Sequence, residues 1–265
     1  MSSFFILSQT GENASENSSN SSSNFRFTPK QADKFTILLT ISKEASDFPH
    51  SVFLISLNAF EGKVRVLRLP EVCLLSEGAE NKVILKECFQ KSGSDAAMKA
   101  ISRFFNINVS RYISFTNQNF ISLIDLFEPA ALDVTEDLNE VDRKNDIYIK
   151  IDKGRQLLGG SLMLDIFAYK KYKGGSAQRF SESARALCAF FSQNAKDLMS
   201  AQQFILANSK TNISALDFES RREMISYLFS LKDAAESVKI YGEYQLENTQ
   251  FTITTASKTK IAALF

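Results

Sequence analysis

The chain of 265 residues lacks tryptophan and has one histidine, four prolines and three cysteines. The single histidine, His50, argues against a cluster of histidine metal ligands and against a Ser–His catalytic relay. Cys73, Cys88 and Cys188 are odd in number and include no Cys-x-x-Cys pair, so neither a disulfide framework nor a zinc site is indicated. Any catalysis would therefore depend on carboxylates, arginines and lysines.

An excess of charge of one sign is also lacking, because 31 basic residues nearly balance 30 acidic ones. No global field would draw the chain to nucleic acid, and we expect no nucleic-acid partner. Long apolar runs are absent too, since no segment approaches the roughly 20 residues of a membrane helix. The apolar segment Phe4–Leu7 is too short even for a signal peptide. No membrane anchor is therefore visible, and whether one precedes Met1 stays open.

What the chain does contain divides it in two. Residues 8–24 are almost entirely Ser, Asn, Glu, Gly and Thr, which bury too little apolar surface to offset the entropy of ordering. We therefore predict a flexible leader over residues 1–30 and one folded domain over residues 31–265. The hydrophobic content of 44% is ample for the core of such a domain.

In the folded part, β-branched apolar runs are mixed with segments of helical periodicity. This mixture predicts an α/β (α+β) fold, a single layered domain with a mixed central sheet and helices on both faces. Predicted strands cover 35–41, 51–57, 64–69, 111–115, 131–134 and 147–151, with a closing hairpin from 238–246 and 251–255. Predicted helices cover 95–105, 117–126, 160–170, 177–199, 202–207 and 214–231. In strand 64–69, we expect Val64, Val66 and Leu67 to face inward and Arg65 and Arg68 to point to solvent or to the sheet edge.

Three phrases, in this order and spacing, resemble the LytR-CpsA-Psr domain. The first is SVFLISLNAFEGKVRVLRLPEV, Ser51–Val72, which is similar to that family's strand hairpin ending in S-I-P-R-D. The second is AMKAISRFFNINVSRYISFTNQNFISLIDLF, Ala97–Phe127, which looks like the family's helix, ID-x-Y strand and F-x-x-L-V-D helix. The third, Lys153–Phe191, is similar to its G-x-x-L-x-G segment and the helix that carries D-x-x-R-x-x-R-Q. Together they cover roughly Phe35 to Phe191, and the remaining predicted helices and the closing hairpin are compatible with the rest of that domain.

The resemblance implies a concrete activity. Members of the family lie outside the cytoplasmic membrane and hold a polyprenyl-phosphate or pyrophosphate lipid in an apolar tunnel between sheet and helices. They transfer a glycopolymer to peptidoglycan, with arginines and an aspartate-bound magnesium ion at the tunnel mouth. Clustered cations offset the negative charge of the transition state, and forked guanidinium groups grip phosphate oxygens.

This chain departs from the family's pattern at the positions that carry charge. After Pro70, Glu71 and Val72 stand where the family has arginine and aspartate. In the R-x-D position before the second strand, the chain has Phe48 and His50. Glutamate in place of arginine repels a pyrophosphate, and His50 is a poor ligand for a hard ion such as magnesium.

The third phrase keeps one charged position. Arg179 matches the first arginine of the helix motif, whereas Ser176 replaces its aspartate and Glu182 its second arginine. Arg179 is therefore the candidate catalytic residue, and Glu71 is the candidate metal ligand. Candidates for binding lipid phosphate or polymer are Arg179, Arg68, Lys170, Lys171 and Lys173, although cations at a helix end are more often simply solvated. Aromatic residues that either line a lipid tunnel or fill the core are Phe104, Phe105, Phe120, Phe127, Phe190, Phe191 and Phe204.

Three interpretations follow from the sequence. The first is a divergent, non-catalytic member of the family on the outer side of the cytoplasmic membrane, which either binds a polyprenyl-phosphate lipid or a wall glycopolymer or serves as a scaffold without chemistry. The second is an active glycopolymer phosphotransferase with a rearranged cluster of Arg179, Lys171 and Glu71. The third is an α/β protein-interaction domain unrelated to the family. We expect no cofactor in the first case and magnesium in the second, and the sequence does not predict an oligomeric state.

Overall fold

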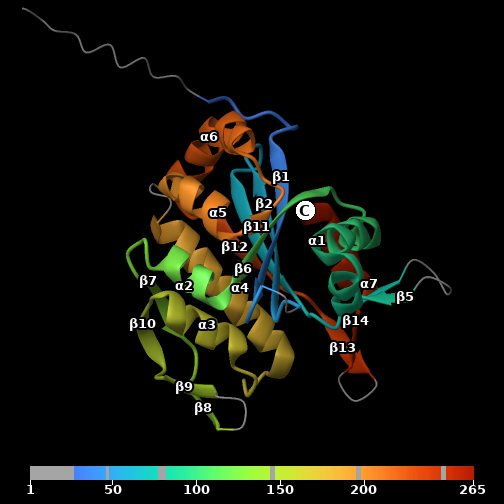
Figure 1. The fold of residues 1–265 in the computed structure, drawn as a ribbon, viewed down its shortest axis with the longest axis vertical. Helices are drawn as coiled ribbons and strands as arrows, with labels where there is room; N and C mark the ends of the chain where they lie inside the picture. The colour runs from blue at the N-terminus through green and yellow to red at the C-terminus, as the bar shows by residue number, and fades with distance from the viewer. Residues whose placement is uncertain (1–26, 46–47, 77–81, 144–146, 195–197, 246–248) are drawn as a thin grey trace, which may run out of the picture.

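The computed structural model describes residues 27–45, 48–76, 82–143, 147–194, 198–245 and 249–265. A mixed sheet of six strands stands in the middle, and helices cover both of its faces (Figure 1). The predicted fold class is confirmed. Most of the leader predicted over residues 1–30 lies outside the described residues.

The central sheet has the order β11-β6-β1-β2-β3-β12. β1 pairs antiparallel with β2 and parallel with β6, and β3 pairs antiparallel with β2 and parallel with β12. The register places Leu39, Phe53 and Arg68 side by side across β1, β2 and β3. The strands are β1 (Lys34–Ser42), β2 (Ser51–Asn58), β3 (Lys63–Leu69), β6 (Val109–Thr116), β11 (Lys210–Thr211) and β12 (Ala235–Val238).

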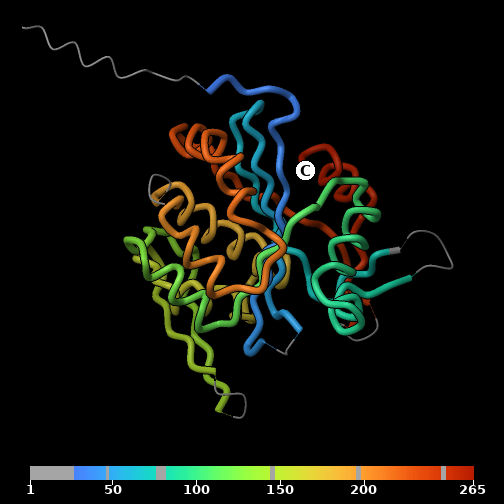
Figure 2. The backbone as a smooth tube through the Cα atoms, turned by 45° about the horizontal axis from the view of Figure 1, so that its top comes forward, coloured from blue at the N-terminus to red at the C-terminus, as the bar shows by residue number. Residues whose placement is uncertain are grey.

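Both faces of the sheet are buried, which explains the near-continuous apolar runs of its inner strands. Every residue of β2 is buried, for example. One apolar core joins the sheet to the helices α2 (Asn117–Ile124), α3 (Gly160–Ala168), α4 (Gly175–Asn194), α5 (Gln202–Asn208) and α6 (Ala215–Ser230). A second core joins the other face to α1 (Leu85–Phe105), α7 (Thr255–Leu264) and the hairpin of β13 (Gly242–Gln245) and β14 (Gln250–Ile253). Figure 2 shows the two helical layers on opposite sides of the strands.

Short hairpins extend beyond the sheet. β4 (Leu74–Ser76) pairs with β5 (Lys82–Ile84), β8 (Leu138–Asp142) with β9 (Ile147–Ile151), and β7 (Ala130–Val134) with β10 (Gly154–Leu158). A 3-10 turn, η1 (Leu198–Ala201), leads into α5. None of the helices in the described ranges combines the length and the hydropathy that a membrane span needs.

The structure departs from the sequence-based prediction at the carboxyl-terminal end. Instead of one strand over 238–246, β12 ends at Val238 and β13 begins at Gly242, while residues 246–248 lie outside the described part. Helix α7 was not predicted, although Thr254 caps it by accepting a hydrogen bond from the amide of Ser257.

Helix α1 begins ten residues earlier than predicted and kinks at Ser92 and Gly93, so its second half starts where the sequence placed the helix.

Candidate functional site

Arg68 lies fully buried at the carboxyl end of β3, beneath α3 and α4. One guanidinium nitrogen, Nη1, donates to the carbonyl of Phe167 at 2.8 Å and to Oγ of Ser183 at 2.6 Å, and Nη2 donates to the carbonyl of His50 at 3.2 Å. The prediction that Arg68 faces solvent or an edge is wrong. Alternation along β3 places it on the same face as Val64 and Val66, and α3 and α4 cover that face.

The expectation that Arg65 faces solvent or a sheet edge is also wrong, because the opposite face of β3 is covered as well. β12 pairs along β3, so β3 is not an edge strand. Arg65 is 6% exposed and forms ion pairs with Glu236 at 2.7 Å and with Glu61. Its Nη1 also donates to the carbonyl of Leu264 in the last turn of α7, at 3.2 Å. Arg65 therefore holds the sheet to α7 and is not part of the site around Arg68.

Arg179, on the first turns of α4, meets Arg68 at one shared acceptor. Its Nε donates to the carbonyl of Phe167 at 3.1 Å, the same oxygen that Arg68 binds. Its Nη2 lies 3.8 Å from Oε1 of Glu71, which follows Pro70 at the end of β3. The structure thus brings together three of the sequence-predicted candidates, Arg68, Arg179 and Glu71, in what we call the arginine centre.

The buried charge of the arginine centre is positive but small. Burial, with a contribution from Arg179, lowers the pKa of Arg68 to about 9, so its guanidinium is still charged at neutral pH. The rings of Phe53, Phe167 and Phe180 lie about 6 Å from that guanidinium, within the range of cation–π attraction. Two guanidinium groups against the single carboxylate of Glu71 leave one net positive charge. This is less than the family's pattern implies for a pyrophosphate.

His50 borders the arginine centre between two polar side chains. Its Nε2 lies 2.7 Å from Oδ1 of Asn117, and its Nδ1 lies 3.0 Å from Oγ of Ser51. Burial lowers the pKa of His50, and the charges of Arg68 and Arg179 lower it further, whereas Asn117 and Glu71 act in the opposite direction. The imidazole is therefore neutral at pH 7. Sequence reasoning did not single out Asn117, although it begins a helix directly after a strand end.

The lowered pKa of His50 predicts a loss of stability in acid. An unfolded chain binds a proton near pH 6.5, before the folded chain does, so the contribution of His50 to the free energy of unfolding should fall as the pH drops below about 6.5. The difference in that free energy between the unchanged chain and His50→Asn, measured by urea unfolding from pH 7.5 to 5, should show this decrease. Because His50 is the only histidine, its Hε1 proton gives one histidine resonance by NMR. A midpoint at or above 6.5 for that resonance would contradict the expected shift.

The candidate lysines, Lys170, Lys171 and Lys173, interact with two carboxylates, one on β8 and one just before that strand. Lys171 pairs with Glu140 at 3.5 Å, and the amides of Lys170 and Lys173 donate to Glu140 and Glu136. These contacts include neither Arg68 nor Arg179. All three lysines are exposed, while Tyr172 between them is buried and donates from its hydroxyl to the carbonyl of Ile166 at 3.2 Å.

The position of the family's second helix arginine does not contribute to the arginine centre. Glu182, which stands in the place of the second arginine, accepts a hydrogen bond from Nη1 of Arg185 at 2.6 Å, and among the described residues no ion pair joins it to Arg179. The residues present do not fit a magnesium ion, which prefers several oxygen ligands. No group of three His, Cys, Asp or Glu side chains that could hold a metal occurs within the described ranges. Glu71, the candidate metal ligand, instead contacts Arg179.

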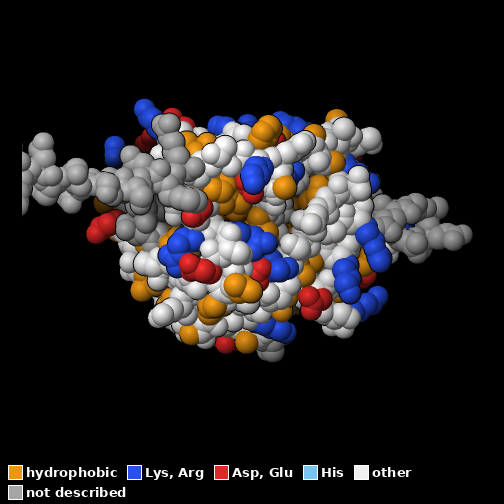
Figure 3. All heavy atoms as spheres, turned by 90° about the horizontal axis from the view of Figure 1, so that it is seen from above, with side chains coloured by type: hydrophobic (Ala, Val, Ile, Leu, Met, Phe, Trp, Pro, Cys, Tyr) orange, Lys and Arg blue, Asp and Glu red, His pale blue; other side chains and the backbone are white. Residues whose placement is uncertain are grey.

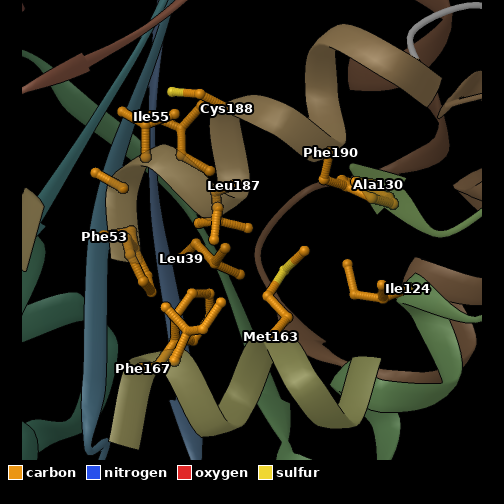
Figure 4. Packing of buried hydrophobic residues seen from close by; sticks show 14 of the residues in the cluster. Leu39, Phe53, Ile55, Ile124, Ala130, Met163, Phe167, Leu187, Cys188 and Phe190 are labelled. Atoms are coloured by element: carbon orange, nitrogen blue, oxygen red, sulfur yellow. The ribbon is translucent and has the colours of Figure 1, made fainter. Parts of the chain in front are cut away.

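An apolar cavity of about 160 Å³ lies between the sheet and the helices α2, α4, α5 and α6. Leu39 and Ile55 line it on the sheet side, and both are next to Phe53, which separates them from Arg68. Figure 4 shows Phe53 beside Leu39 and Phe167 below them, and the ring centroids of Phe53 and Phe167 are 5.0 Å apart. Of the phenylalanines considered from the sequence, Phe127, Phe190 and Phe191 line the cavity, whereas Phe104, Phe105 and Phe120 are buried in the cores.

These features define a class of protein: a three-layer α/β domain that encloses an apolar cavity close to a pair of arginines. More particularly, the chain belongs to the LytR_cpsA_psr family (LytR-CpsA-Psr), whose sequence model matches residues 3–263. The resemblance inferred from the three phrases is confirmed. The third interpretation, a domain unrelated to the family, is therefore wrong.

Solved structures share the fold at low identity. A protein described as a transcription regulator from Eubacterium siraeum has a TM-score of 0.81 and 20% identity, over 97% of this chain and 98% of that one. TagT, solved bound to LIIa-WTA, has a TM-score of 0.71 and 19% identity, over 90% and 91%. TagV of B. subtilis has a TM-score of 0.68 and 18% identity, over 87% and 94%. No curated protein matches the chain.

Proposed function

We propose that this chain acts on the outer side of the cytoplasmic membrane, where it binds a polyprenyl-phosphate-linked glycopolymer without transferring it. Family membership supports the class of ligand, and TagT, which shares the fold, was solved bound to LIIa-WTA. The observation that carries the proposal is the arginine centre beside an apolar cavity, because such a lipid combines a phosphate with an apolar tail.

The arginine centre would bind the phosphate of the ligand, and the cavity would hold its apolar tail. Arg179 is the phosphate ligand, since it is 9% exposed, and Arg68 behind it is fully buried. The apolar tail occupies the cavity, which lies on the other side of Phe53 from Arg68. The exposed Lys170, Lys171 and Lys173 add positive charge on the side of the polymer.

Two features support binding without chemistry. The net charge of the arginine centre is one positive unit, whereas phosphoryl transfer relies on several cations around the reacting phosphate. Glu71 also takes the place of a family arginine and, among the residues that the structure describes, is the carboxylate that pairs with Arg179. Transfer would need an oxygen-rich site for magnesium, and the described residues around Glu71 do not provide one.

Calorimetry with farnesyl pyrophosphate tests the binding proposal. Arg179→Gln should weaken binding by about 10-fold to 100-fold, the loss expected for a charge-assisted hydrogen bond. Arg103→Gln, which removes an exposed arginine of α1, is the matched control and should leave affinity unchanged. Equal affinity for farnesol would contradict phosphate recognition. Magnesium-dependent transfer of a lipid-linked polymer that is lost in Arg179→Gln would replace the proposal with the second interpretation, an active phosphotransferase.

A further inference from the structure

The hairpin of β13 and β14 is docked next to both sides of the arginine centre. The amide of Phe251, on β14, donates to the carbonyl of Val72 at 2.9 Å, and Val72 directly follows Glu71. The ring centroid of Phe251 also lies 5.9 Å from that of Phe180, the residue after Arg179 on α4. Figure 1 shows the hairpin in the lower half of the molecule, far from α6 at the top. One residue of the hairpin therefore contacts a neighbour of each member of the Glu71–Arg179 pair.

Tyr244, on β13, lies directly opposite Phe251 in the register of the hairpin. The two ring centroids are 5.0 Å apart and the rings meet edge to face, an arrangement that aromatic pairs prefer. Gly242, the first residue of β13, leaves room for this packing, because a Cβ atom there would lie 2.6 Å from the ring of Phe251. The buried ring of Phe251 thus fixes the position of the half-buried Tyr244.

The phenol group of Tyr244 lies beside the arginine centre. It shares a hydrogen bond with the side chain of Ser176, in the first turn of α4. Burial raises the pKa of Tyr244, and the negative charge of Glu71 raises it further. The charge of Arg179, the hydrogen bond with Ser176 and the charge of Arg68 lower that pKa by less. The phenol is therefore protonated at neutral pH and can donate a hydrogen bond to an anion.

A second tyrosine near the two arginines is already engaged. Tyr172 interacts with Arg68 and Arg179, but it is buried and its hydroxyl donates to the carbonyl of Ile166 at 3.2 Å. Tyr244 differs in being half-buried and in having another hydroxyl as its partner. Exchange of a neutral hydroxyl for a phosphate oxygen strengthens the hydrogen bond, because bonds to charged acceptors are the stronger kind. Tyr244 is therefore the tyrosine that a phosphate can recruit.

The α6 end of the molecule does not favour a phosphate in the same way. Basic and acidic side chains are interspersed on that face (Figure 3). The hollow there is lined by three carboxylates and three cations, so its lining has no positive excess. These charged residues are Asp33, Glu219, Glu223, Lys34, Arg221 and Arg222. In the arginine centre two guanidinium groups face one carboxylate, and the neighbouring hydroxyls of Ser176 and Tyr244 add donors without adding charge.

We propose that Tyr244 binds the phosphate together with Arg179, so that the β13–β14 hairpin forms one wall of the binding site. This inference rests on the proposed function and extends the site beyond the three phrases, which end at Phe191. The phenol exchanges Ser176 for one phosphate oxygen, and Arg179 donates to another. A neutral donor at this position compensates in part for the second helix arginine, whose place Glu182 takes in this chain.

Calorimetry with farnesyl pyrophosphate and with farnesol tests this role. Tyr244→Phe removes the hydroxyl and keeps the ring against Phe251. It should weaken the binding of farnesyl pyrophosphate by about tenfold, the lower end for a hydrogen bond to a charged group, and leave the affinity for farnesol unchanged. Tyr241→Phe, which removes the hydroxyl of an exposed tyrosine just before β13, is the matched control and should change neither affinity. Thermal melting verifies that both variants fold.

The results that would overturn the inference differ in what they mean for the proposed function. Equal affinity of the unchanged chain for farnesyl pyrophosphate and farnesol would overturn both. A loss of affinity in Arg179→Gln, with less than about a twofold change in Tyr244→Phe, would overturn the role of Tyr244 alone. An equal loss for both ligands in Tyr244→Phe would mean that the hydroxyl supports the hairpin and does not bind the phosphate, which would also overturn that role alone.

Discussion

Replacing Glu71 with glutamine is expected to tighten the binding of farnesyl pyrophosphate by about tenfold at low salt, and Glu71→Arg by more. Oε1 of Glu71 lies 3.8 Å from Nη2 of Arg179, so the carboxylate occupies the side of the guanidinium that a phosphate would use. Two like charges 4 Å apart repel by about 4 kcal/mol at the effective dielectric constant of a protein surface. Because Glu71 is partly exposed, solvent screens much of that repulsion, which leaves the smaller effect expected here.

Glu140→Gln is the matched control for this measurement. It removes a carboxylate of similar size that contacts Lys171 instead of Arg179, and it should leave affinity unchanged. The increase from Glu71→Gln should shrink as salt rises from 0.05 to about 0.5 M, because exposed charges are screened within about 10 Å at 0.1 M. Tighter binding in Glu140→Gln, with none in Glu71→Gln, would move the phosphate from Arg179 to the lysines.

The main sheet could be predicted from sequence because its strands are buried on both faces. Uninterrupted apolar runs such as 35–41 and 51–57 are typical of strands in the interior of a covered sheet, and both form strands. The hydrophobic periodicity of 117–126 likewise predicted α2, which ends at Ile124. Helix α7 was missed because its ten residues carry a weak amphipathic pattern, and it is packed against α1 by contacts distant in sequence.

The arginine centre could be predicted in part. Arg179 and Glu71 were found through the family's motifs, and Arg68 was named as a candidate but directed outward. Alternation with Val64 and Val66 was the signal that would have placed Arg68 inward, against the general expectation that arginine is solvated. The carboxylates that meet the lysines lie about 30 residues away in sequence. No local pattern in residues 170–173 predicts these carboxylate partners. The structure was therefore needed to show that the lysines interact with Glu136 and Glu140 and are not part of the arginine centre.

Arg68→Ala is expected to destabilise the domain by about 3–5 kcal/mol, a large share of the 5–15 kcal/mol that typically holds a domain together. The side chain is fully buried, and it donates to Phe167, Ser183 and the carbonyl of His50. Removing it leaves three buried acceptors without this donor and a cavity between β3, α3 and α4, and both effects cost stability. Urea unfolding measured at pH 7 gives the free energy directly.

Arg68→Met separates charge from packing. Methionine fills much of the same volume among the rings of Phe53, Phe167 and Phe180 and removes the cost of a buried charge, so it should destabilise less than half as much as alanine. Arg103→Ala, at an exposed position of α1, should change stability by less than about 0.5 kcal/mol. A loss below about 1 kcal/mol for Arg68→Ala would mean that α3 and α4 hold the arginine centre without Arg68. Arg179 would then be anchored on Phe167 by its own hydrogen bond, and the buried arginine would have no part in orienting it.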